Sequence, residues 1–346
     1  MENLRKIKQK PPFGSLVFLR TMIGLLLCGA LMLDASGDAH AASCDDVGGT
    51  IVGTECQISG EVTASGNFLL PQTLHILTGG VIIVSPETIG LTIDIAGDLI
   101  MDTGSKIDGD VTGNDLIGAA ITINATGNII LHGDGINGAI ITAEHEGSCT
   151  PPGMGGSVEL NANSDAPSDL NGDLTIQPGS EISVDATGCP AGEIILTGAN
   201  ISTGGNIHSE SQLTGTGASQ RPGGGPITLQ ASCNLAVSNT GVVRSKGRDP
   251  GADLVHLGGG CEVRIEGLVE STGPAHSVPD SPPNHCNNTN RPDKPANSTA
   301  CIEVWAGDAL LIDNSGSMNG EVNADTAQSG GHQIAWIDLV ARGDIT

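Results

Sequence analysis

The sequence is almost free of aromatic residues. It has no tyrosine, three phenylalanines and two tryptophans among 346 residues. Beyond residue 42 only Phe68, Trp305 and Trp336 remain. A β-sandwich of this length is normally built around a large core that contains aromatic side chains, so the scarcity disfavours that architecture. Carbohydrate-binding grooves usually offer aromatic platforms to sugar rings, and the sequence gives little support for one.

Basic residues are also scarce. The chain has 14 Lys and Arg against 39 Asp and Glu, which gives a formal net charge of −25 at pH 7. Such a negative field repels phosphate backbones and anionic lipid headgroups. We therefore expect no nucleic-acid partner and no binding to a membrane surface. A surface glycan or a protein is the ligand that we expect instead.

Long apolar runs are absent except near the N-terminus. Five basic residues precede an apolar run at residues 22–33, and residues 39–41 (Ala-His-Ala) supply a small-x-small cleavage site. This run is too short to cross about 30 Å of hydrocarbon, which disfavours a membrane anchor. A lipoprotein would carry its lipid on Cys28, but Leu27 stands where a small residue is wanted. We predict a signal peptide over residues 1–42, no membrane insertion after its cleavage, and a secreted or cell-surface location, which in a Gram-negative cell means the periplasm or the outer-membrane exterior.

No C-x-x-C pair occurs, which argues against a zinc ribbon and a thioredoxin-like redox site. Nine cysteines are present, and eight remain after the signal peptide is removed. An even number of cysteines in an exported chain predicts disulfides. Proximity along the chain is the only guide to their pairing. The expected pairs are Cys44 with Cys56, Cys149 with Cys189, Cys233 with Cys261, and Cys286 with Cys301.

Glycine is abundant, with 51 residues, and it punctuates a repeat. Short strands of alternating apolar and polar residues recur throughout the chain, and this alternation is typical of extended chain and not of a helix. These strands open at Leu91, Ile121, Val158, Ile194, Ile227, Val263, Ile302 and Ile334. Within a unit, a second strand often follows a Gly-Asp or Gly-Asn pair, as in residues 97–107 and 172–182.

The repeat predicts an all-β fold, a right-handed parallel β-helix. Each coil of such a solenoid stacks on the next, and about six inward aliphatic side chains per coil contribute about 1.5 to 3 kcal/mol each. Residues 43–90 are expected to form an N-terminal cap that contains a disulfide-closed hairpin and the first strands. The repeats are expected over residues 91–346. Since the chain stops at a Gly-Asp-Ile-Thr string of the kind that elsewhere begins a strand, we expect it to be truncated at the C-terminus.

Gly- and Pro-rich insertions collect at one place in each unit. They are residues 147–156, 215–225, 246–253 and 273–300. Insertions at equivalent positions of a solenoid project from the same face. That loop face is therefore the expected binding surface.

The repeat resembles that of bacterial exported β-helix proteins of the filamentous-haemagglutinin and adhesin type, whose coils carry strings such as GDLTIQPGSEISVDATG (172–188). The resemblance covers about residues 90–346 and implies a non-enzymatic surface protein that acts as a stalk or as a binding scaffold. The sequence departs from the family in two respects. No N-P-N-G signature of two-partner secretion is present, and the given sequence ends at Thr346 and not at the aromatic terminus of an autotransporter barrel, so the export route stays open.

A polysaccharide-active enzyme, a lyase or a glycoside hydrolase, is the alternative, because pectate lyases and polygalacturonases are also parallel β-helices. A lyase needs a metal to neutralise the uronate and a base to take its proton. The densest mixed-charge group consists of Arg244, Lys246, Arg248, Asp249 and Asp253. We favour a solvated loop as the explanation of this group. We predict no catalytic residue and no organic cofactor.

Calcium is the one cofactor that the sequence leaves open. Asp108, Asp110, Asn114 and Asp115 resemble a nonapeptide calcium turn. A second stretch, residues 169–173, begins like a D-x-N-x-D loop. Both are incomplete, and Asx turns at the corners of a solenoid would explain the same residues without an ion.

Overall fold

The computed structural model describes residues 43–85, 90–113, 118–148, 155–162, 172–212, 224–247, 254–274, 298–315, 318–319, 321–327 and 334–346. All of them belong to one unit, Ala41–Thr346. The predicted signal peptide lies outside the described residues. Among those described, no helix is long and apolar enough to span a membrane.

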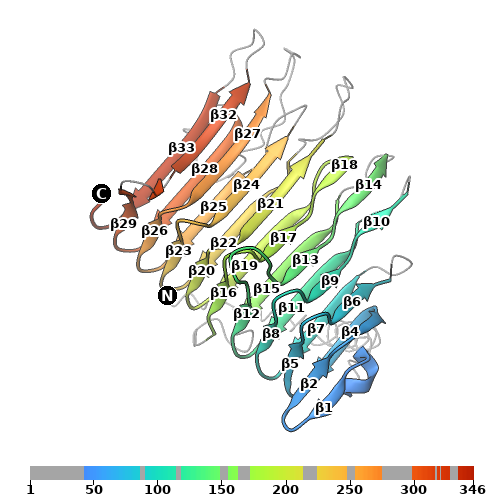
Figure 1. The fold of residues 1–346 in the computed structure, drawn as a ribbon. Helices are drawn as coiled ribbons and strands as arrows, with labels where there is room; N and C mark the ends of the chain where they lie inside the picture. Colours follow the sequence, from blue (N-terminus) through green and yellow to red (C-terminus); the bar gives the residue numbers. More distant parts are fainter. Residues whose placement is uncertain are drawn as a thin grey trace, which may run out of the picture. The chain divides into compact units, whose positions relative to one another are not determined.

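The described chain forms three long sheets, A, B and C (Figure 1). Sheet A contains β4 (Gly66–Leu70), β7 (Leu91–Ile95), β11 (Ala120–Ala125), β15 (Ser157–Ala162), β19 (Glu193–Gly198), β22 (Ile227–Ala231), β25 (Leu254–Gly259), β28 (Ser298–Ala306) and β33 (Ile334–Ala341). Sheet B contains β1 (Thr50–Val52), β2 (Glu55–Ile58), β5 (Thr73–Ile76), β8 (Leu99–Met101), β12 (Ile129–Leu131), β16 (Leu174–Ile176), β20 (Ile201–Thr203), β23 (Leu235–Val237), β26 (Val263–Ile265) and β29 (Leu310–Ile312). Sheet C contains β3 (Glu61–Ala64), β6 (Val81–Val84), β9 (Lys106–Asp108), β10 (Val111–Thr112), β13 (Ile140–Thr142), β14 (His145–Ser148), β17 (Glu181–Ser183), β18 (Ala186–Gly188), β21 (Asn206–Ser211), β24 (Val242–Gly247), β27 (Leu268–Pro274) and β32 (Glu321–Ala327). A small hairpin joins β30 (Asn314–Ser315) to β31 (Met318–Asn319).

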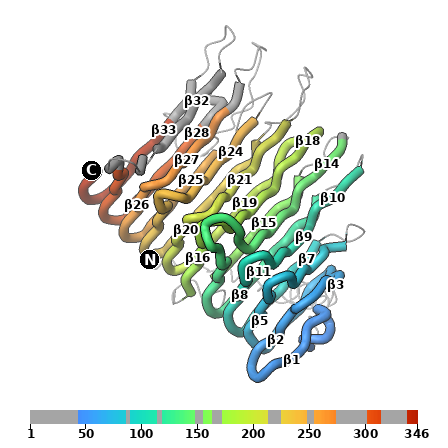
Figure 2. The backbone as a smooth tube through the Cα atoms, in the orientation of Figure 1, coloured from blue at the N-terminus to red at the C-terminus, as the bar shows by residue number. Residues whose placement is uncertain are grey.

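Successive strands of the chain visit sheets A, B and C in turn, and each strand pairs in parallel with its equivalents in the preceding and following coils. Figure 2 shows this coiling as a continuous tube. The predicted parallel β-helix is therefore confirmed. Its right-handed sense stays a prediction. Coiling already includes β4, β5 and β6, so it begins before residue 91.

Aliphatic residues set the register of the sheets. The inward column of sheet A consists of Leu91, Ile121, Val158, Ile194, Ile227, Val255, Ile302 and Ile337. A strand does open at Val263, as predicted, but it is β26 in sheet B, and Val255 on β25 holds the equivalent position in the repeat of sheet A. Ile334 is also displaced, since it pairs with Ser298 and Ile337 holds the inward position. The cause is the unequal length of the coils, which are 28 residues before Val255 and 47 after it.

Stacked aliphatic side chains fill the interior. In the coil β7–β9 they number six, namely Leu91, Ile93, Ile95, Leu99, Met101 and Ile107, each at most 1% exposed. In the coil β19–β21 four aliphatics remain, namely Ile194, Leu196, Ile201 and Ile207. There the interior also contains small polar residues such as Ser209, which is completely buried. The predicted six per coil is thus correct for the early coils and too high for the later ones.

A column of glycines allows the chain to turn from sheet C into sheet A. Its members are Gly118, Gly156, Gly192 and Gly225. A Cβ on Gly192 would overlap the carbonyl oxygen of Gly156, and a Cβ on Gly225 would overlap that of Gly192. The buried Ser209 Oγ donates to the Gly192 carbonyl oxygen at 2.8 Å, and Ser245 Oγ donates to that of Gly225 at 2.9 Å. Backbone approaches backbone here, so no side chain can be accommodated.

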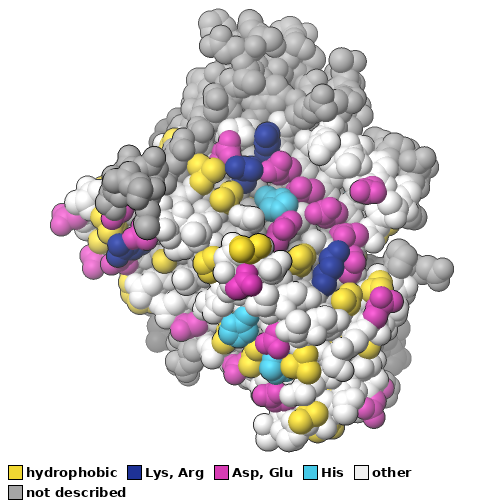
Figure 3. Space-filling model, in the orientation of Figure 1, with side chains coloured by type: hydrophobic (Ala, Val, Ile, Leu, Met, Phe, Trp, Pro, Cys, Tyr) yellow, Lys and Arg dark blue, Asp and Glu magenta, His cyan; other side chains and the backbone are white. Residues whose placement is uncertain are grey.

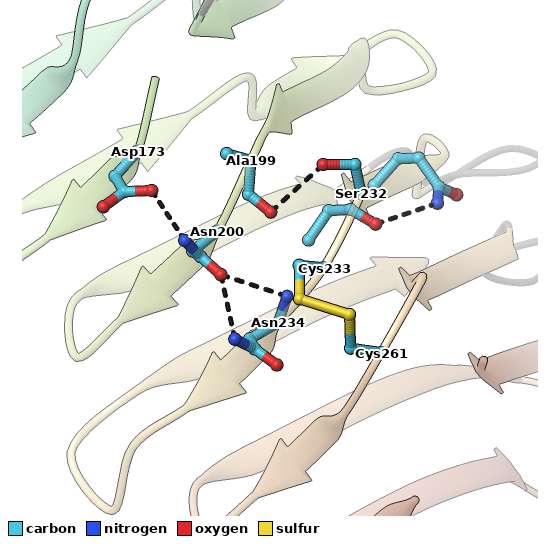
Figure 4. Close-up of a disulfide and its surroundings, with 9 residues drawn as sticks. Asp173, Ala199, Asn200, Ser232, Cys233, Asn234 and Cys261 are labelled. Carbon is cyan, nitrogen blue, oxygen red and sulfur yellow. Dashed lines mark hydrogen bonds between the residues drawn. A yellow bond between two sulfur atoms is a disulfide. The ribbon is translucent and has the colours of Figure 1, made fainter. Parts of the chain in front are cut away.

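The Gly-Asp and Gly-Asn pairs of the repeat occupy the corner from sheet A to sheet B. Asp and Asn side chains at this corner form a hydrogen-bonded ladder from coil to coil. It is made of Asp98, Asn128 and Asp173 from such pairs, and of Asn200 and Asn234, which follow Ala199 and Cys233. Asn200 Nδ2 donates to Asp173 Oδ1 at 2.8 Å, and the backbone N–H of Asn234 donates to Asn200 Oδ1 at 3.2 Å (Figure 4). Asp173, the last residue of the suggested calcium stretch 169–173, thus serves this ladder, whereas residues 169–171 lie outside the described residues.

The predicted disulfide Cys233–Cys261 is confirmed, and it joins two successive coils (Figure 4). Its two Cα atoms are 4.4 Å apart. Each cysteine lies two residues before the start of β23 or β26, at the corner from sheet A to sheet B, and the equivalent residue before β12 is a glycine, Gly127. The bridge therefore links equivalent positions of neighbouring coils.

The predicted disulfide-closed hairpin at the N-terminus is also confirmed. A short 3-10 helix, η1 (Cys44–Val47), is capped by Ser43, whose backbone N–H donates to Asp46 Oδ2 at 2.6 Å. Strand β1 then pairs antiparallel with β2, and Cys44 is bonded to Cys56 in β2. This is the antiparallel pair at the end of sheet B, so the hairpin covers an edge that would otherwise be open.

Two further cysteines, Cys189 and Cys301, are disulfide-bonded. Their expected partners, Cys149 and Cys286, lie outside the described residues. The pairing of these four therefore stays a prediction.

Removal of the Cys233–Cys261 bridge is expected to lower the free energy of unfolding by about 3 to 4 kcal/mol, because the bridge restricts a long loop of the unfolded chain. It spans 28 residues, against 12 for Cys44–Cys56. Loss of the shorter bridge should cost about 1 kcal/mol less. Urea unfolding of the double variants C233A/C261A and C44A/C56A measures both. A larger loss in the second variant would contradict an explanation by loop entropy.

All four predicted insertions connect a strand of sheet C to the next strand of sheet A. They separate β14 from β15, β21 from β22, β24 from β25, and β27 from β28. The chain therefore leaves the coil at one corner each time. Most residues of these insertions lie outside the described residues.

Candidate interaction face on sheet C

The outward face of sheet C carries most of the charged side chains that interact with one another. Strand residues alternate between the aliphatic interior and solvent, so the residues between the inward ones face outward. We call the resulting set the charged stripe. It consists of Lys106, Asp108, Asp110, Glu144, Glu181, Asp185, His208, Glu210, Arg244, Lys246 and Glu270. Figure 3 shows acidic side chains, interrupted by basic and histidine side chains, in a band across the visible face.

His208 on β21 lies between two carboxylates of the preceding coil. Its Nε2 is 3.0 Å from Glu181 Oε1, and its Nδ1 is 3.1 Å from Asp185 Oδ1. Burial by itself lowers the pKa of His208, but the hydrogen bonds to Asp185 and Glu181 and their charges outweigh it and raise the pKa to about 10. Only the imidazolium form can donate to both carboxylates. The hydrogen bond from His208 in turn lowers the pKa of Glu181.

Arg244 on β24 links three coils. Its Nε donates to Glu270 Oε2 on β27 at 2.6 Å, and its Nη1 donates to Glu210 Oε1 on β21 at 3.3 Å. Of the mixed-charge group in the sequence, Arg244 and Lys246 lie on the charged stripe. The other members, at positions 248, 249 and 253, lie outside the described residues. Arg244 is therefore engaged in structural ion pairs within the sheet.

Lys106 joins two of the residues suggested for calcium. Its Nζ is 3.0 Å from Asp108 Oδ2 and 3.1 Å from Asp110 Oδ2. Burial alone would raise the pKa of Asp108, but the hydrogen bond from Lys106 and one from the Asp110 backbone lower it below its ordinary value. The two carboxylates thus share one ammonium group. The remaining candidates, Asn114 and Asp115, are outside the described residues.

Glu144 lies among acids in the middle of the stripe. Ser183 Oγ donates to Glu144 Oε1 at 2.6 Å, and the Glu144 backbone N–H donates to Asp110 Oδ1 at 2.9 Å. Burial raises the pKa of the Glu144 carboxyl, and the charges of Asp110 and Asp185 add to this rise. Glu144 thus holds its proton more readily than an ordinary glutamate does.

A second bridging histidine, His75, lies on β5 in sheet B. Its two ring nitrogens are each 3.1 Å from a carboxylate, Glu55 on one side and Asp102 on the other. Burial lowers the pKa of His75, but the hydrogen bonds to Asp102 and Glu55 raise it above the ordinary value. Neither His75 nor His208 was singled out from the sequence. Both histidines occupy outward positions of strands in which apolar and polar residues alternate, and acids occupy outward positions of the neighbouring strands. This pattern could have identified them from the sequence.

Across the described part of the chain, no group of three or more His, Cys, Asp or Glu side chains has the arrangement needed to hold a metal ion. Comparisons with protein-family models, with curated proteins and with solved structures found no match to this chain.

Proposed function

We propose that the chain is an exported, adhesin-like surface protein whose parallel β-helix serves as a stalk or binding scaffold. The observation that carries the proposal is the arrangement of cations on sheet C. Lys106, His208 and Arg244 each contact two carboxylates, and the last two link neighbouring coils. Ion pairs between neighbouring coils stabilise their stacking on the outer surface, and the columns of buried aliphatic side chains stabilise it in the interior. Such a solenoid supports loops at one corner without needing a catalytic centre.

Export is the part of this proposal that can be tested first. Mass spectrometry of the protein recovered from its source cells should find an N-terminus near residue 42. Surface biotinylation with a reagent that does not cross membranes should label it on intact cells. A chain that keeps residues 1–41 and is labelled only after lysis would refute the proposal.

The alternative, a polysaccharide-active enzyme, is favoured by one observation, the raised pKa of Glu144. A general acid must hold its proton near working pH. Asp110 and Asp185, which flank Glu144, would then be candidates for the second carboxylate that glycoside cleavage requires.

If the protein is a scaffold, neither the wild type nor E144Q should cleave polygalacturonate or neutral polysaccharides, so no new unsaturated or reducing ends should appear. Absorbance of unsaturated uronates and a reducing-end assay measure the two reaction types. D134N, an exposed acid outside the charged stripe, is the matched control. Cleavage by the wild type and by D134N that is lost in E144Q would establish the enzyme instead.

A further inference from the structure

The outward face of sheet A contains an exposed tryptophan at the end of a polar column. From β7 to β33 the column consists of Asp94, Asn124, Asn161, Thr197, Gln230, Gly258, Trp305 and Val340. The first four members hydrogen-bond to one another from coil to coil at 2.6 to 2.8 Å. Trp305, with 39% of its surface exposed, is the largest side chain in the column. A chain this poor in aromatics thus places an indole on a solvent-facing sheet.

The indole of Trp305 is held by a fixed neighbour. The ring of His256, on the adjacent strand β25, meets it edge to face, with centroids 6.1 Å apart and planes at 64°. His256 Nδ1 is in turn 3.3 Å from Glu303 Oε2, and Glu303 is only 2% exposed. Because the buried carboxylate fixes the imidazole, the indole has a defined orientation before any ligand arrives.

Space and a polar group lie beside this indole. Gly258 is the register partner of Trp305 on β25 and has no side chain. A Cβ at Gly258 would overlap the Gln230 carboxamide, so that exposed amide group lies over the glycine. A flat aromatic face next to a carboxamide suits the apolar face and the hydroxyl groups of a sugar ring.

We propose that this surface, composed of Trp305, Gln230 and Gly258, binds a neutral glycan. The indole stacks against the C–H face of a pyranose, and the Gln230 amide hydrogen-bonds to a hydroxyl group. Charge selects against uronates, because Glu303 and Asp338 are cross-strand partners beside the indole and the whole chain carries a net charge of −25. The inference rests on the proposed role as a surface scaffold and names the class of its ligand.

Affinity electrophoresis in native gels tests this site with the full mature chain. Separate gels contain neutral polysaccharides (a β-glucan, a galactomannan and a xylan) or polygalacturonate. We expect at least one neutral polymer to retard the wild type and polygalacturonate to have no effect. W305A should lose at least about tenfold in affinity, and Q230A should lose a few-fold. L69A, which truncates an apolar residue 38% exposed on the outward face of β4 in the same sheet, should bind like the wild type.

Three results would overturn the inference. They are the absence of retardation by every neutral polymer, equal retardation of W305A and the wild type, and retardation by polygalacturonate alone. Thermal unfolding of each variant shows whether lost binding reflects lost folding, and Q230A keeps the test valid if W305A does not fold. Export and surface labelling are measured separately. A surface-labelled protein that no neutral polymer retards would therefore refute the glycan site and leave the scaffold proposal intact.

Discussion

Replacing Gly192 by alanine is expected to destabilise the β-helix by about 3 kcal/mol or more, because the new methyl group would overlap backbone and not a side chain that can move. A Cβ on Gly192 meets the carbonyl group of Gly156, and the Gly192 carbonyl group is itself overlapped by a Cβ on Gly225. Relief would require the coils to separate at this corner. That separation would break the hydrogen bond from Ser209 Oγ to the Gly192 carbonyl oxygen.

Gly60 provides the matched control, because a Cβ there has no atom within 4 Å. G60A should therefore change the free energy of unfolding by no more than about 0.5 kcal/mol. Urea unfolding followed by circular dichroism compares the two variants with the wild type. Equal stability of G192A and G60A would show that the coils can separate at little cost, contrary to the stacking described above.

Replacing His208 by glutamine is expected to lower the free energy of unfolding at pH 6 by up to about 4 kcal/mol, because Glu181 and Asp185 would lose the cation between them. The effect depends on pH. The folded-state pKa of His208 is about 10, against an ordinary value of 6.5. A raised pKa means that its stabilisation is fully present below pH 6.5 and is lost as the pH rises towards 10. The difference between wild type and H208Q should therefore shrink across that range.

Urea midpoints at pH 6, 8 and 10 measure this dependence. H132Q serves as the control, since it removes a histidine from outside the charged stripe. H75Q should show a dependence of the same sign, because Glu55 and Asp102 raise the pKa of His75 in the same way. A difference between wild type and H208Q that stays constant from pH 6 to pH 10 would contradict the assignment of a bridging imidazolium.

The fold could be predicted from the sequence because its signals are local. Alternation of apolar and polar residues identifies strands, and glycine followed by Asp or Asn identifies one corner of each coil. The phase of the repeat was harder to place. Strands of sheets A and B have the same alternation of apolar and polar residues. Val263 in β26 was therefore taken for the sheet A position that Val255 in β25 holds. The repeat length could not correct this, because the coils on either side of Val255 differ by 19 residues.

The polar clusters could not be predicted in the same way, because they join residues far apart in the chain. His208 and Glu181 are 27 positions apart, and His75 and Asp102 are also 27 apart. Their contact depends on the register between neighbouring strands. Arg244 was noticed for the charges that follow it in sequence, yet its partners in the structure are Glu210 and Glu270 on the neighbouring strands.

The sequence by itself determined that this chain forms a parallel β-helix. Its short strands, joined at glycine corners, can bury their aliphatic side chains only by stacking on neighbouring copies of the same repeat. Proximity along the chain also predicted two of the disulfides, Cys44–Cys56 and Cys233–Cys261. Only the tertiary structure decided which polar residues meet. Stacking brings residues separated by one coil to the distance between neighbouring strands, about 4.8 Å. Carboxylates, imidazoles and the exposed indole of Trp305 are thereby assembled into faces that no short stretch of the sequence contains.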